Sequence, residues 1–212
     1  MNQPELQKIT DWLIDGARSA TSPTRLMSET CERLVAAGLP LYRVGVFVRT
    51  LHPDIYGRNF IWRPGAEVEM GTVDFNILES PAFMNSPLMI VFTEGKEVRG
   101  RLEDLQGSRF SIFDDLRAEG VTDYIALPLH FTDGLSHASS WTTRQPGGFT
   151  DQQVAALRAL VPALARDSRA ASSTWLQTCL TSPTYSSIGN TASSPSPMNF
   201  RTSPPWSLIA AT

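Results

Sequence analysis

The sequence predicts an α+β fold in which helices cover one side of an antiparallel sheet. Three observations predict it. Segments with helical apolar spacing stand at both ends of residues 1–168, and short stretches rich in β-branched and aromatic residues lie between them. The connections between several of these stretches are too short for the crossover that parallel strands require. The pair Asp133-Gly134 is a strong signal for a β-hairpin.

Two helices are expected first. Residues 4–20 place apolar side chains at three- and four-residue steps, which is typical of an amphipathic helix. The second helix starts at Pro23, because Ser22-Pro23 puts proline at the first helical position. Gly38 is the residue type that commonly follows a helix end, so this helix is expected to stop there.

Three strands in succession follow. The stretch "LYRVGVFVRT" at residues 41–50 is the strongest strand signal of the chain. Short turns rich in proline, glycine and aspartate connect it to two further strands, so neighbours are expected to pair antiparallel. These strands are expected at residues 58–63 and 67–73.

Residues 74–107 interrupt the sheet. Ser80-Pro81 and Ser86-Pro87 each predict a helix start, and Gly95 predicts the end of the second of these helices. The elements expected between there and the hairpin are a short edge strand and a short helix, at residues 96–102 and 110–120.

The hairpin strands and a long exit helix complete the fold. The strands are expected at residues 122–131 and 135–144, on either side of the turn. Thr150 and Gln153 stand at capping-box spacing, and Phe149 is placed to pack against Val154, which predicts a helix beginning at this point. Four apolar residues form one stripe along this helix: Val154, Leu157, Val161 and Leu164.

Composition argues against several partner classes. The net charge is -3 and no run of Lys or Arg occurs, so neither nucleic acid nor an anionic membrane is expected as a partner. We find no apolar stretch of about 18 residues for a membrane helix and no signal peptide. Cys31 and Cys179 lack disulfide or metal-site spacing, which fits a soluble protein of the reducing cytoplasm.

Two groups of polar residues could be read as metal sites. Asp114-Asp115 could hold a metal ion, but Ser111 and Asp114 at capping spacing favour an ordinary helix start. His130 and His137 flank the hairpin turn and could meet across it, yet a third ligand is missing. No phosphate-binding loop or nucleophile elbow occurs. The sequence therefore predicts no catalytic residue, no metal and no cofactor.

Aromatic residues on the expected strands have two possible roles. They could line a small-molecule pocket between sheet and helices, or they could be ordinary core. The five candidate pocket residues are Tyr42, Phe47, Trp62, Tyr124 and Trp141, and Phe60 belongs to the same aromatic set.

Four segments, in this order, carry a resemblance to a known family. They are "WLIDGARSA" (12–20), "CERLVAAGLPLYRVGVFVRTLHPDIYGRNFIWRPG" (31–65), "LRAEGVTDYIALPL" (116–129) and "WTTRQPGGFTDQQVAAL" (141–157). Over roughly residues 5–167 they strongly resemble the N-terminal region of bacterial class III adenylate/guanylate cyclases of the α-proteobacterial type. That region looks like a GAF-type sensory domain.

The resemblance implies a function in signal transduction. In this family the last sensory helix continues through a linker into a catalytic domain that works as a dimer. A homodimer with contacts at Val154, Leu157, Val161 and Leu164 is therefore expected, as is a small-molecule effector. No position here matches a catalytic residue of the family, so the chain is expected to be truncated before the catalytic domain and inactive alone.

Residues 169–212 differ from the rest of the chain. From Ala170 onward Arg201 is the only charged residue, and the segment is rich in Ser, Thr and Pro. Such a composition cannot bury enough apolar surface to order itself, so disorder is expected. Its origin is either a natural low-complexity tail or a frameshift.

Two function hypotheses follow for residues 1–168. The first is the regulatory sensory domain of an adenylate/guanylate cyclase. The alternative is a free-standing small-molecule sensor, with its pocket near the strand aromatics.

Overall fold

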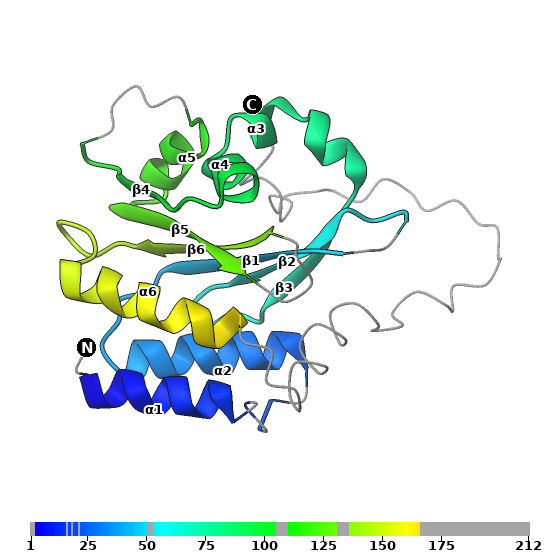
Figure 1. Ribbon diagram of the computed structural model, residues 1–212. Helices are drawn as coiled ribbons and strands as arrows, with labels where there is room; N and C mark the ends of the chain where they lie inside the picture. Colours follow the sequence, from blue (N-terminus) through cyan, green and yellow to red (C-terminus); the bar gives the residue numbers. More distant parts are fainter. Residues whose placement is uncertain are drawn as a thin grey trace, which may run out of the picture.

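The computed structural model describes residues 3–15, 17, 19–20, 22–50, 53–104, 110–130 and 136–165 (Figure 1). The tail expected over residues 169–212, the turn at Asp133-Gly134 and Cys179 lie outside the described residues. In chain order the elements are α1 (Gln3–Ile14), α2 (Pro23–Ala36), β1 (Arg43–Arg49), β2 (Gly57–Trp62), β3 (Glu69–Val73), η1 (Phe75–Glu79), α3 (Pro81–Met84), α4 (Pro87–Glu94), β4 (Val98–Arg101), α5 (Ile112–Ala118), β5 (Asp123–His130), β6 (Ser136–Thr143) and α6 (Asp151–Ala165).

The strands form one antiparallel sheet in the order β3-β2-β1-β6-β5-β4. The expected antiparallel meander of β1, β2 and β3 and the hairpin of β5 and β6 are both confirmed. Strand β6 pairs with β1 in the centre, with Val44 opposite Trp141. The short strand β4 is an edge strand, as expected from its sequence.

Helices cover both faces of the sheet, which corrects the expectation of helices on one side. Figure 1 shows α1, α2 and α6 on one face, the α6 face, and α3, α4 and α5 on the other, the α4 face. Each face has its own apolar cluster. In β1, Val46 packs into the cluster of the α6 face and Phe47 into that of the α4 face. The sheet is therefore the middle layer of three.

The helix boundaries follow local signals in most cases. Ser22 Oγ accepts a hydrogen bond from the Arg25 N–H at 3.2 Å, and Ser86 Oγ accepts one from the Met89 N–H at 3.3 Å, so two of the three expected Ser-Pro helix starts are capped. Ser80 precedes α3 without a side-chain capping hydrogen bond. Gly95 closes α4 in a left-handed conformation with φ 64°. Serine thus caps the starts of α2 and α4, and glycine ends α4.

Two local expectations were wrong. Helix α1 ends at Ile14 and not at residue 20, because Ala17 has a positive φ of 44°, which does not continue a right-handed helix. Ser111 makes no side-chain capping hydrogen bond and itself has helical φ and ψ. Asp114 instead accepts a hydrogen bond from Arg117 Nη1 at 2.6 Å within the same helix.

The start of α6 is fixed by the capping box that its sequence predicts. The Thr150 N–H donates to Gln153 Oε1 at 2.8 Å, and the Gln153 N–H donates to Thr150 Oγ1 at 3.2 Å. Phe149 and Val154 are both buried in the cluster of the α6 face, as a hydrophobic staple requires. The position at which α6 leaves the sheet is thus specified by residues 149–154.

Candidate functional site

A small apolar cavity lies on the α4 face, between the end of β1, the start of β2 and the end of β3 on one side and the segment η1 to α4 on the other. Its volume is about 20 Å³. A space of that size admits a water molecule, so an organic ligand must displace side chains to enter. The lining residues are Phe47, Val48, Arg49, Tyr56, Gly57, Arg58, Val73, Ile77, Phe83, Leu88 and Phe92.

Small residues of the sheet make room on this face. A Cβ atom added to Gly45 would lie 2.7 Å from Ser140 Oγ and 2.9 Å from the Phe47 ring. The Phe47 ring therefore lies over Gly45, where any larger residue would push it away. Gly71 plays the same part on β3, because a Cβ there would overlap the Asn59 side chain.

A second, smaller cavity lies behind the first. About 10 Å³ of it is open to the centres of water molecules, and it shares Phe47 and Leu88 with the larger cavity. Three hydroxyl-bearing residues, Ser86, Tyr124 and Ser140, line it. Phe47 and Leu88 thus belong to the walls of both cavities.

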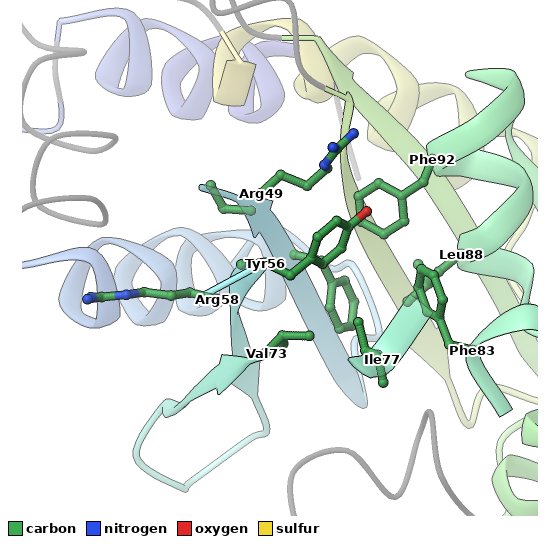
Figure 2. A pocket seen from close by; sticks show the side chains of 11 residues that line it. Arg49, Tyr56, Arg58, Val73, Ile77, Phe83, Leu88 and Phe92 are labelled. Atoms are coloured by element: carbon green, nitrogen blue, oxygen red, sulfur yellow. The ribbon is translucent and has the colours of Figure 1, made fainter. Parts of the chain in front are cut away.

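Arg49 and Tyr56 stand together at the larger cavity. The Arg49 guanidinium carbon lies 5.0 Å from the centroid of the Tyr56 ring, a cation–π distance. Burial raises the pKa of the Tyr56 phenol and the Arg49 charge opposes this shift, so Tyr56 is protonated at neutral pH. Figure 2 shows Arg49 running beside Tyr56, whereas Arg58 extends away from the other lining side chains.

The structure brings only two of the five candidate pocket residues to the cavities. Phe47 lines both cavities and Tyr124 lines the smaller one. Trp62 and Trp141 are buried core residues of the α6 face and line neither cavity, so their assignment to a pocket stays a prediction. Both pair with Val44, which places all three side chains on that face.

Tyr42 lines neither of the two cavities. Its hydroxyl donates to Glu119 Oε2 at 3.0 Å and accepts from Arg144 Nη2 at 2.8 Å. The Arg144 guanidinium carbon lies 3.6 Å from the centroid of the Tyr42 ring. Burial and the neighbouring Glu119 raise the pKa of Tyr42. These contacts join the start of β1 to the end of β6 and give Tyr42 a structural role.

The apolar stripe of α6 is divided between core and partial exposure. Val154 is 1% exposed and Leu157 0% exposed, both within the cluster of the α6 face. Their side chains have no surface to offer a second chain, which corrects their assignment to dimer contacts. Val161 and Leu164 are partly buried against the same cluster, so dimerisation through these two stays a prediction.

A buried ion pair joins the sheet to the start of α6. Asp123 of β5 is fully buried, and its carboxylate lies 2.8 Å from Arg99 Nη2 of β4. The same carboxylate accepts the Phe149 N–H at 3.0 Å, and Arg99 Nη2 donates to the Phe149 carbonyl at 2.7 Å. We call these three residues the Asp123 junction. The junction therefore ties β4 and β5 to the backbone of Phe149, two residues before α6 begins.

The hypothetical metal ligands do not assemble. The register places Leu129 opposite His137 and His130 opposite Ser136, so the two histidines lie on opposite faces of the hairpin. His137 Nδ1 accepts the Arg49 N–H at 3.0 Å. Among the described residues no group of three His, Cys, Asp or Glu side chains could hold a metal ion. Within the same residues, no helix has the length and apolar character needed to cross a membrane.

No protein-family model matches the sequence, and no curated protein matches it significantly. Solved structures with a similar fold include several GAF domains. The phycoerythrobilin-bound GAF domain of a cyanobacterial phytochrome matches with a TM-score of 0.54 and 13% identity, over 83% of this chain and 98% of that one. The GAF domain of a phosphoenolpyruvate-protein phosphotransferase from Coxiella burnetii matches with a TM-score of 0.52 and 14% identity, over 78% and 93% of the two chains.

A third neighbour is the GAF domain of a two-component sensor histidine kinase from Bacillus halodurans, with a TM-score of 0.50 and 14% identity over 69% of this chain and 92% of that one. At such identities the likeness shows the fold alone. The chain has a GAF-like α+β fold, which confirms the expected fold class. None of these three neighbours is a cyclase, so the resemblance to cyclases rests on the four sequence segments.

Proposed function

From the GAF-like fold and the cavity on its α4 face, we propose that this chain is a regulatory sensory domain that binds a small molecule and is not itself catalytic. The observation that carries the proposal is the cavity itself. Apolar and aromatic side chains make up most of its lining, and Arg49 and Tyr56 supply a few polar groups, which is the usual composition of a small-molecule site.

The signal would travel from the cavity to α6 through the sheet. Leu88 of α4 lines both cavities, and α4 packs against β5 and β6. Strand β5 carries Asp123, which binds the backbone of Phe149 at the start of α6. A ligand that shifts α4 would therefore change the position of β5 and with it the start of α6.

The proposed output partner is the catalytic half of a class III adenylate/guanylate cyclase in the cytoplasm. The four segments that resemble this family support the proposal, and the last of them covers the start of α6. The active sites of such enzymes form between two catalytic domains, so the proposal includes a homodimer. The partly exposed Val161 and Leu164 are the residues of the stripe still able to take part in its contacts.

Filling the cavity with a tryptophan side chain should abolish ligand binding. In a thermal-shift screen of small metabolites, a ligand of the folded state raises the melting temperature of the wild-type chain. Val73 lines the cavity from the edge strand β3 and is partly exposed, so Val73→Trp is expected to remove the shift with little loss of stability.

The matched control is Thr72→Trp. Thr72 is the neighbouring residue on β3, is exposed and does not line the cavity. A ligand that raises the melting temperature of Thr72→Trp and of the wild type equally, but does not raise that of Val73→Trp, binds in the cavity. A ligand that still stabilises Val73→Trp binds elsewhere and would count against the cavity as the sensory site.

A fusion separates the two function hypotheses. When this chain is joined through α6 to the catalytic domain of a class III cyclase, a ligand found in the screen is expected to change the rate of ATP turnover. A ligand that binds the fusion without changing turnover would favour the free-standing sensor.

A further inference from the structure

We propose that the ligand of the larger cavity is an organic acid with a slender apolar body, whose acidic group binds Arg49. This inference rests on the sensory function proposed above and adds the chemical class of the ligand.

The charges around the cavity favour an anion. Arg49 and Arg58 are the charged residues that line it, and no carboxylate does so. Figure 2 shows that the Arg58 side chain extends away from the other lining residues, which leaves Arg49 as the cation of the site. A guanidinium beside an apolar wall attracts an anion more strongly than one in open water, because the local dielectric constant is lower.

Arg49 and Arg58 differ from Arg63 and Arg99 of the sheet in their partners. Arg63 pairs with Glu69 and Arg99 with Asp123. In the part of the chain that the structure describes, Arg49 has no such carboxylate partner, and its guanidinium lies over the ring of Tyr56. Its backbone is nevertheless held, because the Arg49 N–H donates to His137 Nδ1 and the residue pairs with Gly57. The backbone of Arg49 is therefore fixed, while its guanidinium contacts the Tyr56 ring and keeps its N–H groups available to an anion.

A single guanidinium matches a single carboxylate. The two form paired N–H···O hydrogen bonds in one plane, which adds geometric selectivity to the charge attraction. Phosphate esters carry more charge and are usually held by several donors, and no second cation of the lining turns toward this cavity. The site thus fits a monocarboxylic acid better than a nucleotide.

The rest of the cavity favours a slender apolar body. Ile77, Phe83 and Phe92 form its wall, and little free space remains between them. Behind Phe47 and Leu88 lies the second cavity, so a chain that displaces the Phe47 ring would join the two. An unbranched alkyl chain is the apolar shape that needs the least displacement to enter so narrow a space.

The test compares decanoate with decanol, which share the alkyl chain and differ in charge. Isothermal titration calorimetry on the full chain is expected to show tighter binding of decanoate. Arg49→Gln should weaken decanoate binding by about tenfold to a hundredfold, the range for a lost hydrogen bond to a charged group, and leave decanol binding unchanged. Arg101→Gln is the matched control: Arg101 is exposed on β4 and does not line the cavity, so this variant removes the same charge and should change neither affinity.

Each other outcome overturns a defined part of the inference. If decanoate and decanol bind with equal affinity and Arg49→Gln changes neither affinity, the ligand is not selected as an acid. The cavity would then remain a binding site for apolar molecules. Decanoate binding that persists in Val73→Trp would place the acid outside the cavity. If neither probe binds the wild type or Phe47→Leu, in which the ring between the cavities is smaller, the assignment of a slender organic acid is overturned, whereas the sensory role is decided separately by the thermal-shift screen with Val73→Trp.

Discussion

Replacement of Gly148 by alanine is expected to lower the free energy of unfolding by roughly 3 kcal/mol, the sum of left-handed backbone strain and local overpacking. Gly148 has a φ of 75°, and a Cβ atom there would lie 2.6 Å from Asp123 Oδ2 and 2.7 Å from Asp123 Cβ. The carboxylate cannot retreat, because Arg99 and the Phe149 N–H hold it in the Asp123 junction. Urea unfolding followed by circular dichroism measures the loss.

Gly147 provides the matched control. It has the same φ of 75°, but a Cβ atom added there would meet nothing within 4 Å. Gly147→Ala is therefore expected to cost about 1 kcal/mol from backbone strain alone. The difference between the two variants isolates the contact with Asp123. Equal losses in both would show that the junction yields easily and does not hold the start of α6.

A charge at Leu157 is expected to unfold the domain. Leu157 is 0% exposed at the centre of the α6 face. Placing a carboxylate there buries a charge without a partner, which is expected to cost more than about 4 kcal/mol. Small domains are stable by only about 5–15 kcal/mol, so Leu157→Asp should lose most of its helical and strand circular dichroism.

Leu164→Asp is the companion variant, because Leu164 is only partly buried on the same stripe. It should keep the wild-type spectrum, and sedimentation should show weaker self-association if the proposed homodimer uses this part of α6. A native spectrum for Leu157→Asp together with reduced self-association would contradict the assignment of Leu157 to the core. An unchanged association state in Leu164→Asp would remove this residue from the dimer proposal.

Local sequence signals predicted most of the elements. Residues 41–50 and 122–131 are rich in strand-forming residues, and Thr150 with Gln153 form a capping box whose partners are only three residues apart. The two helical layers were missed for a physical reason. A strand buried on both faces reads as a nearly continuous apolar run, as Val44 to Val48 does, and such a run does not say what covers each face.

The site was harder to predict because it depends on strand register. Phe47 and Trp62 are both aromatic strand residues, yet Phe47 lies opposite Asn59 and Trp62 opposite Val44, which puts their side chains on different faces. Arg49 lies at the end of a strand and Phe83 in the segment that interrupts the sheet. No sequence motif marks these residues, and only the packing of η1 to α4 over the sheet brings them together.

The strand order also determines when the domain can fold. Strands β1, β2 and β3 are made first, but the central partner of β1 is β6, whose pairing residues Ala138 to Thr142 are among the last strand residues synthesised. Pairing β1 with β6 closes a long loop. The chain loses conformational entropy before the contacts between the two strands form, which slows folding. Until β6 leaves the ribosome, β1 presents an unpaired edge on which nascent chains can aggregate. The smallest piece of this protein that could fold as a unit therefore extends from β1 through β6, although every residue that lines the larger cavity lies in its first half.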